Sequence, residues 1–213
     1  PLFPVLLFLI SSLCMQAQVL DQGNFILGAT LGFSKADSKI SLTSPDVNED
    51  EKGHSALQFS VAPKIGYFLL ENFALGIGMD YTFSTVKEPD LNRTDDSDLL
   101  FGPFSRYYFP LTEDMALFAE VNAGFGNSSD EQFIGGITQN ISTNIFAVGV
   151  GPGFTIFSSE DIGIEALIKY NYARSQFDTN LNGVQTTRTT KTNQLDISLG
   201  LQFYFGGIRK VGN

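Results

Sequence analysis

Apolar residues recur at every second position over runs of about ten residues, and this alternation constrains the fold more than any other feature. In "ALGIGMDYTFS" the apolar set that alternates with glycine or polar residues is Leu75, Ile77, Met79, Tyr81 and Phe83. Similar runs begin at Phe25, Leu57 and Leu195. A period of two is that of a β-strand with one apolar face. Runs of about 10–12 residues are twice the average strand length and suit a tilted bilayer crossing.

Composition agrees with an all-β chain. The 213 residues include 20 Phe, 21 Gly and no Trp, with 43% hydrophobic residues. Aromatic and glycine richness without long helical patterns favours strands, and the length suits one domain. The net charge of −10 argues against a nucleic-acid partner.

The first segment, "PLFPVLLFLISSLCMQAQ", is an apolar run that ends in small and polar residues. It is shorter than a membrane-spanning helix and fits a secretory signal peptide over residues 1–17, truncated at its start, with the mature protein beginning at Gln18. Cys14 is the only cysteine, so an intrachain disulfide is impossible. A lipoprotein anchored through Cys14 is disfavoured because Leu13 stands where a small residue is required.

An internal repeat begins at three prolines, Pro63, Pro103 and Pro152. Each copy has a strand end, a short turn and a second strand, and the turns centre on Asn72, Asp114 and Asp161. The copies are spaced by about 40 and 50 residues, and propeller blades or solenoid coils also repeat at such spacings. A blade, however, has four short strands, whereas each copy here is one long hairpin. Three hairpins and the strands at Phe25 and Leu195 make eight strands, which close an up-and-down barrel over residues 18–205 followed by a tail, 206–213. Because a closed barrel has no edge strand, each proline predicts a bulge or a missing ladder bond.

The connections and the aromatic residues indicate a membrane. Three connections are tight, and four are long and polar, over residues 36–55, 85–98, 127–142 and 174–193. Short periplasmic turns and long extracellular loops are typical of outer-membrane barrels, as are two aromatic girdles. The girdle predicted beside the tight turns comprises Tyr67, Phe68, Tyr107, Tyr108, Phe109, Phe157 and Phe205. The girdle predicted near the loops comprises Phe33, Phe59, Phe83, Phe125, Phe146 and Tyr172. A soluble lipocalin-like barrel is the alternative, but the polar face is too small and glycine-rich to coat a soluble exterior.

The mature chain resembles the small outer-membrane β-barrel proteins often labelled porin-like, with the eight-stranded OmpA/OmpX-type architecture. The stretches that carry this resemblance are "PKIGYFL" from Pro63, "GPFSRYYF" from Gly102 and "LGLQFYF" ending at Phe205. The resemblance implies an all-β transmembrane barrel in the outer membrane of a Gram-negative bacterium, and a last strand whose terminal aromatic is read by the barrel assembly machinery. Phe205 matches that position, although "GGIRKVGN" follows it. We expect a monomer embedded in outer-membrane lipid.

With the apolar set facing lipid, the alternate set fills the barrel. The predicted lumen charge network comprises Lys64, Asp80, Arg106, Glu120, Glu165, Lys169 and Asp196. Buried charges are tolerable only when they are paired, so we expect an interlocked network. A structural plug is favoured over a proton or small-ion path because eight-stranded barrels are filled by side chains.

Three other motifs are weaker. "DVNEDE" from Asp46 resembles a calcium loop, but Glu51 replaces the required glycine. Gly149, Gly151 and Gly153 resemble a phosphate-binding loop without the helix that it needs, and more simply make room in a narrow barrel. His54 beside Ser55 suggests a serine hydrolase, but adjacent strand residues point to opposite faces. We expect no enzyme, cofactor or metal.

Two functions stay open. The first is a non-enzymatic surface protein that supports membrane integrity or binds an extracellular ligand through its loops, whose acidic residues favour cationic or divalent-bridged partners. The second is a narrow porin-like conduit for small solutes.

Overall fold

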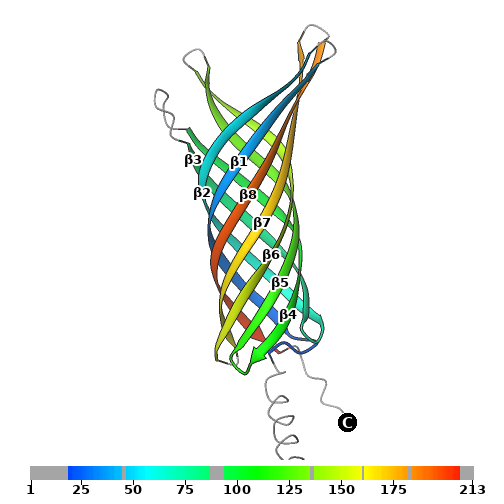
Figure 1. The fold of residues 1–213 in the computed structure, drawn as a ribbon, viewed down its shortest axis with the longest axis vertical. Helices are drawn as coiled ribbons and strands as arrows, with labels where there is room; N and C mark the ends of the chain where they lie inside the picture. The colour runs from blue at the N-terminus through cyan, green and yellow to red at the C-terminus, as the bar shows by residue number, and fades with distance from the viewer. Residues whose placement is uncertain are drawn as a thin grey trace, which may run out of the picture.

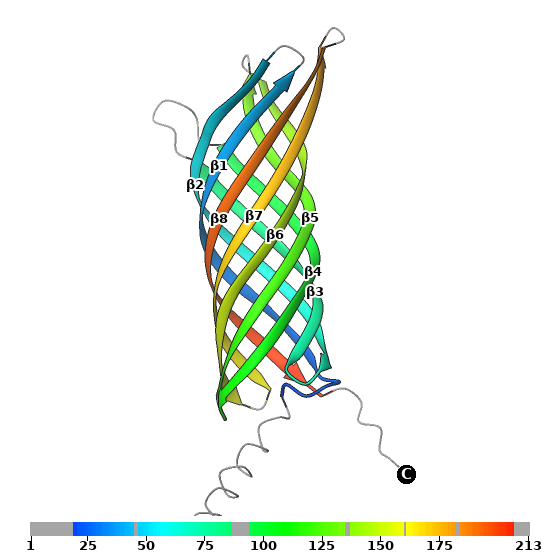
Figure 2. The ribbon, with the colours of Figure 1, turned by 45° about the vertical axis from the view of Figure 1, so that its right-hand side comes forward.

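Eight strands of the described chain form one closed antiparallel barrel (Figures 1 and 2). The computed structural model describes residues 19–44, 47–86, 94–134, 137–159, 161–181 and 184–206. The strands are β1 (Phe25–Ser44), β2 (Val47–Leu70), β3 (Phe73–Val86), β4 (Thr94–Thr112), β5 (Met115–Ile134), β6 (Ile137–Ser159), β7 (Ile162–Leu181) and β8 (Val184–Phe205). Each strand pairs with the next, and β1 pairs with β8 to close the ring. The predicted eight-stranded up-and-down barrel is therefore confirmed, while the predicted signal peptide (1–17) and residues 207–213 of the tail lie outside the described residues.

Side chains alternate between lumen and outer surface, as the period-two pattern predicts. On β8 the outward residues are apolar from Leu195 to Phe205, and Leu199 is 65% exposed. The lumen side of the same strand carries Asp196, Ser198, Gln202 and Tyr204, all at most 9% exposed. Ten residue steps along a tilted strand give an apolar band about 25 Å tall, which matches the hydrocarbon band of outer-membrane barrels. No helix in the described ranges is long and apolar enough to cross a membrane.

Three of the four long connections that the sequence predicts, 36–55, 127–142 and 174–193, are mostly strand, which corrects that part of the prediction. Residues 87–93 of the connection 85–98 lie outside the described residues. Strands β1 and β2 pair as far as Ser44 and Val47, and β7 and β8 pair as far as Leu181 and Val184. These segments are polar on both faces, for example "VQTTRTTKTN", because water lies on both sides of them above the membrane. The apolar–polar alternation therefore disappears while the hydrogen-bonded ladder continues.

Above the apolar band the barrel wall separates into two parts. The β2–β3 ladder ends at Leu57 opposite Thr85, and the β6–β7 ladder ends at Asn144 opposite Gln176. Strands β7, β8, β1 and β2 continue as one paired sheet beyond these points, and β5 and β6 continue as a hairpin. Figure 1 shows these two extensions diverging at the end opposite the tight turns.

The three repeat hairpins share one local design at the periplasmic end. Each has a register shift just before its tight turn, and Asn72 in the first turn has a φ of 63°, a conformation that asparagine tolerates better than most residues. The prediction at the prolines is confirmed in its second form. Each proline keeps its pairing on one side, and the ladder to the hairpin partner is interrupted without a change of register: between Val61 and Lys64, between Phe101 and Phe104, and between Val150 and Gly153.

Candidate functional site: the filled lumen and the outer surface

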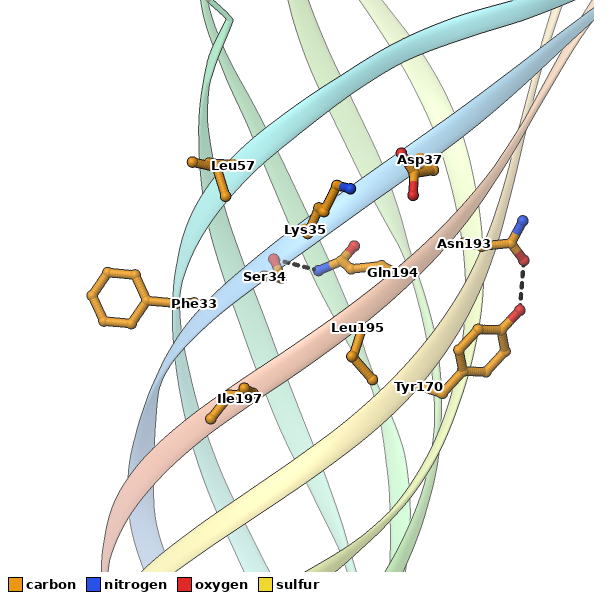
Figure 3. Close-up of a pocket in the computed structure, with 10 residues that line it drawn as sticks. All are labelled: Phe33, Ser34, Lys35, Asp37, Leu57, Tyr170, Asn193, Gln194, Leu195 and Ile197. Atoms are coloured by element: carbon orange, nitrogen blue, oxygen red, sulfur yellow. Dashed lines mark hydrogen bonds between the residues drawn. The ribbon is translucent and has the colours of Figure 1, made fainter.

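The upper part of the lumen holds a polar layer centred on Asp196. This carboxylate accepts hydrogen bonds from the Asn171 amide and from Gln194 Nε2, the latter at 2.7 Å. Gln194 also donates to Ser34 Oγ at 2.9 Å, as Figure 3 shows. Lys169 lies directly across the β7–β8 ladder from Asp196 and is 9% exposed, but it forms no salt bridge with any side chain that the structure describes. Asp80 of the predicted network also stands apart from the main cluster and accepts a hydrogen bond from Thr82 at 3.0 Å.

The middle of the lumen is crossed by a compact charge cluster of Lys64, Arg106, Glu120 and Glu165. Arg106 Nη1 lies 2.7 Å from Glu165 Oε1, and Arg106 Nη2 lies 2.6 Å from Glu120 Oε2. Lys64 Nζ reaches the same Glu120 oxygen at 2.9 Å. The four residues come from four strands, β2, β4, β5 and β7, so the ion pairs tie distant parts of the wall together across the lumen. The structure thus joins four of the seven predicted network residues.

This charge cluster is balanced and almost dry. Two cations face two carboxylates, and Arg106, Glu120 and Glu165 are 0%, 2% and 1% exposed. The guanidinium also stacks on Phe118, with 4.1 Å from its Cζ to the ring centroid. A buried ion pair is retained only with good geometry and further hydrogen bonds, which Arg106 provides by donating to both carboxylates and to the hydroxyl of Tyr108. These contacts hold the four charged side chains in one arrangement.

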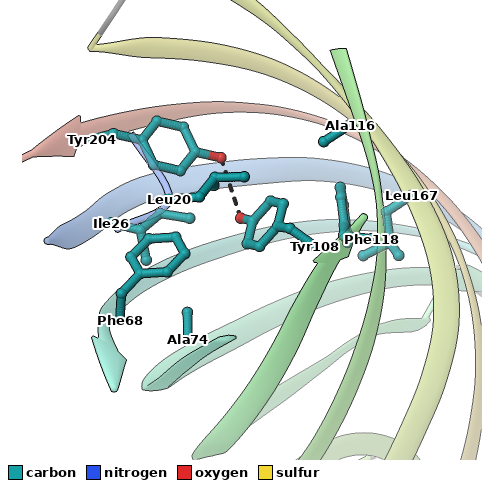
Figure 4. Close-up of a cluster of buried hydrophobic side chains, with 9 residues drawn as sticks. All are labelled: Leu20, Ile26, Phe68, Ala74, Tyr108, Ala116, Phe118, Leu167 and Tyr204. Carbon is teal, nitrogen blue, oxygen red and sulfur yellow. Dashed lines mark hydrogen bonds between the residues drawn. The ribbon is translucent and has the colours of Figure 1, made fainter. Parts of the chain in front are cut away.

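Below the charge cluster an aromatic layer closes the periplasmic end (Figure 4). Phe68, Tyr108 and Tyr204 are at most 1% exposed, with ring centroids 5.7–6.5 Å apart, and Leu20 from the segment before β1 packs among them. Tyr204 Oη donates to Glu165 Oε1 at 2.9 Å, which joins this layer to the charge cluster. Phe157 packs against the layer, with its ring 5.4 Å from that of Tyr204.

The predicted lower girdle is therefore wrong for Phe68, Tyr108 and Phe157, which point inward. Consecutive strand residues cannot share a face, so Tyr67 and Tyr107 take the outward positions. Phe109 and Phe205 also face outward, at 51% and 43% exposure. Strict alternation could have separated the two sets from the sequence alone. In the predicted upper girdle, Phe33, Phe83, Phe125 and Phe146 are 40–69% exposed, and Phe33 lies beside Phe59 and Phe125 beside Phe146 at centroid distances of 5.3 and 4.9 Å.

Glycines make the room that the lumen side chains occupy. A Cβ at Gly149 would meet the side-chain oxygens of Asn122 and Asn171, and one at Gly153 would meet the Phe118 ring. This supports the packing interpretation of these glycines over a phosphate loop. Some buried polar atoms find no partner among the protein atoms: Asn122 Oδ1, Thr155 Oγ1 and both amide atoms of Gln202. Buried polar groups of this kind commonly hydrogen-bond to ordered water.

A groove of about 480 Å³ lies on the outer face of β1 and β8, at the upper edge of the apolar band (Figure 3). Its apolar walls are Phe33, Leu57, Tyr170, Leu195 and Ile197. Lys35, Asp37 and Asn193 lie at its polar side, where Asn193 accepts a 2.6 Å hydrogen bond from the Tyr170 hydroxyl. Sequence reasoning missed this groove because it depends on how adjacent strands curve, which a residue pattern does not encode.

Two sequence motifs fall on residues whose description is incomplete. Asp46 of the calcium-loop motif and the side chains of His54 and Ser55 lie outside the described residues. Among the described residues, no three of His, Cys, Asp and Glu are grouped so that they could hold a metal ion.

A closed eight-stranded barrel with an apolar outer band and a filled lumen defines a class: the small transmembrane β-barrels of the outer membrane. The chain belongs to the family described as outer membrane protein beta-barrel domain, whose family model matches residues 5–203. The protein is accordingly an outer-membrane protein.

Two solved structures are similar in fold. Neisserial surface protein A (NspA) is 17% identical with a TM-score of 0.53, over 83% of this chain and 97% of that one. OprG from Pseudomonas aeruginosa is 14% identical with a TM-score of 0.60, over 89% of this chain and 99% of that one. At these identities the likeness concerns the fold alone. A search of curated protein sequences found no match.

Proposed function

We propose that this protein acts at the cell surface without enzymatic activity, by supporting the outer membrane or binding a partner there, and that its barrel passes no solutes. The observation that carries the proposal is the Arg106 cluster, which spans the lumen above the aromatic layer. A solute would have to break buried ion pairs and then displace packed rings. The chain has one histidine, so a histidine-dependent hydrolase would rest on that residue alone.

The polar extensions are where the surface function would lie. Strands β7, β8, β1 and β2 continue above the apolar band as a paired sheet that exposes both faces to water. A rigid sheet presents side chains at fixed spacing, which suits recognition better than a mobile loop does. We place the binding or membrane-stabilising role on this sheet.

Planar-bilayer recording of the purified, refolded protein tests the closed lumen. We expect no stable conductance above that of the protein-free bilayer. An Arg106→Ala/Tyr108→Ala/Tyr204→Ala variant, which removes side chains from both layers, serves as the opened control and should leak if it folds. A stable open state of the unmodified protein would overturn the proposal.

A deletion strain tests the surface role. We expect greater sensitivity to detergents and unchanged uptake of small solutes. Complementation with a variant in which a two-residue turn joins Asp37 to Ser55, which are cross-strand partners, removes the β1–β2 extension and should leave the barrel intact. Full rescue by that variant would mean that the β1–β2 extension is not required for the function.

A narrow conduit is the second candidate, and one observation favours it. Lys169 is buried without a salt bridge to a described side chain, and Asn122 Oδ1 is buried without a protein partner, so water in the upper lumen would satisfy both groups. A proton path needs such water to continue past Arg106. Proton flux into liposomes, measured with a pH-sensitive dye under an applied potential, would separate this candidate from a plug.

A further inference from the structure

A row of basic side chains crosses the outward face of the extracellular sheet. Lys39 on β1 lies opposite Lys191 on β8, and Lys191 lies opposite Arg174 on β7. All three are exposed, and alternation places them on the same outward face as Phe33, Leu195 and Tyr170 lower on the same strands. Lys52 on β2 is opposite Lys39 by register, although its side chain is outside the description.

This row of like charges destabilises the extracellular sheet when no external anion is bound. Like charges directly opposite each other across a ladder are destabilising, and the chain has a net charge of −10 with only 13 basic residues. Lys39 is neutralised by Asp50 at 2.7 Å. Arg174 and Lys191 form no salt bridge with any described side chain, and neither does Lys35, four residues before Lys39 on β1. Asp50 also attracts Lys191 electrostatically without forming a salt bridge with it. Three exposed cations on one face, none of them in a salt bridge with a described side chain, are therefore available to an external anion.

The apolar groove lies directly below this row. Lys35 sits within an apolar row of the outer wall, flanked by Leu57 on β2 and Leu195 on β8, with Tyr170 beyond. Figure 3 shows Lys35 on β1 above Phe33, with Leu195 of β8 between Lys35 and the Tyr170–Asn193 pair. Leu57 is 77% exposed and Phe33 is 69% exposed, so both walls of the groove face the surroundings of the barrel.

The height of the groove on the barrel indicates which layer of the membrane contacts it. The outward residues of β1 are apolar up to Phe33 and then change to Lys35 and Asp37, and those of β8 change from Leu195 to Asn193. Hydrocarbon therefore contacts the groove, and the headgroup layer contacts the cations above it. The apolar groove with positive charges above it matches one ligand chemistry, an acyl chain joined to a phosphate group.

We propose that this surface binds a phosphate-bearing lipid of the outer leaflet, with an acyl chain in the groove and the phosphate on Lys35, Lys191 and Arg174. Lys35 lies four residues below the level of Lys191, which is about 13 Å along the strands. The two long side chains can extend toward each other and contact the same phosphate. Asp37 lies between the two levels on the same outward face and has an interaction partner. This inference rests on the proposed surface function and gives it a mechanism, because a bound lipid would anchor the barrel to its leaflet.

Native mass spectrometry of the refolded protein in detergent tests the proposal. The probes are dimyristoyl phosphatidic acid and dimyristoyl phosphatidylcholine, which share their acyl chains and differ in headgroup charge. We expect retention of phosphatidic acid at least tenfold stronger than that of phosphatidylcholine. Arg174→Gln/Lys191→Gln should remove this preference, and Leu195→Trp, which fills the groove, should weaken the binding of both lipids.

Arg188→Gln is the matched control for charge. Arg188 is on the same strand as Lys191 and three residues away, so it points to the other face of the sheet. This variant should bind phosphatidic acid as the unmodified protein does. Circular dichroism melting establishes that each variant is folded.

Several outcomes would overturn the proposal: equal binding of the two lipids, an unchanged preference in Arg174→Gln/Lys191→Gln, or the same loss in Arg188→Gln. Inorganic phosphate at millimolar concentration should compete weakly. If it displaces the lipid fully, the surface is a phosphate site without an acyl component, and the lipid proposal fails. The bilayer and deletion experiments report on the proposed function separately, so the failure of one inference is distinguishable from that of the other.

Discussion

Replacement of Lys64 by Met tests whether the charge cluster stabilises the barrel. Lys64 is 8% exposed, and its only salt bridge with a described residue is to Glu120 at 2.9 Å. Coulomb attraction at that distance is about 6 kcal/mol with an effective dielectric constant of 20. Removing the lysine also removes its desolvation penalty, so the measured loss is smaller, and breaking a buried pair from one side costs about 3–5 kcal/mol. Glu120 keeps its contacts with Arg106, so we expect about 3 kcal/mol, the lower end of that range.

The assay is reversible urea unfolding in lipid vesicles. The chain has no tryptophan, so circular dichroism of the strands is the signal. The matched control is Arg188→Met, which removes an exposed cation from the polar upper part of β8, outside the proposed lipid site, and should change the unfolding free energy by less than about 1 kcal/mol.

A double mutant makes the test specific to charge. Lys64→Met/Glu120→Gln leaves the neutral pair of Arg106 and Glu165, so its loss should be smaller than the sum of the two single losses by about 1–3 kcal/mol. If Lys64→Met unfolds like the Arg188→Met control, or if the two losses add, the cluster does not stabilise the barrel in the way described.

Two further predictions concern packing and the extracellular sheet. Gly153→Ala should lower the unfolding free energy by about 1–3 kcal/mol because its Cβ would enter the Phe118 ring, whereas Gly78→Ala, whose Cβ would have 3.6 Å contacts, should be near neutral in the same assay. The hydrogen bond from Lys39, followed by that from Ser41, holds the pKa of Asp50 below its ordinary value of 3.8, so the stabilising contribution of this carboxylate is present above pH 3.8 and is lost as the pH falls through the lower folded pKa. Lys39→Gln should raise that pKa in an NMR titration of the Asp50 carboxyl, and an unchanged midpoint would contradict the assignment.

The sequence predicts the barrel well because the membrane imposes alternation. Outward positions inside the hydrocarbon are mainly apolar, so strands such as β3 and the lower half of β8 can be recognised from the alternation of residue types alone. Above the membrane that constraint ends, and the polar upper half of β8 was indistinguishable from a loop. Backbone hydrogen bonds to the neighbouring strands hold this segment as a strand, and such bonds place little constraint on residue type.

Lumen residues are predictable as a set and not as pairs. Alternation places Lys64, Glu120 and Lys169 inside, but which acid meets which base depends on the stagger of the strands around the ring. Lys64 therefore reaches Glu120 on β5, while Lys169 forms no salt bridge with a described residue. The outer groove and the basic row depend on that same stagger, because their members lie on different strands and meet only through register.

The two layers that close the lumen have different origins in the sequence, so they should open independently. The aromatic layer comes from a unit that occurs four times in the chain. In each copy an inward aromatic residue donates its backbone N–H, at 2.8 Å, to the carbonyl of the residue that precedes the neighbouring strand. The four bonds run from Phe68 to Asn24, from Tyr108 to Asn72, from Phe157 to Asp114 and from Tyr204 to Asp161. The charge cluster has no such repeat, since Gly66 occupies in the first hairpin the place of Arg106 in the second. Loss of the cluster therefore leaves every N–H bond of the aromatic layer in place. An Arg106→Met/Glu120→Gln/Glu165→Gln variant should be less stable and still non-conducting, and an open channel in that variant would mean that the rings close the barrel only when Arg106 holds them.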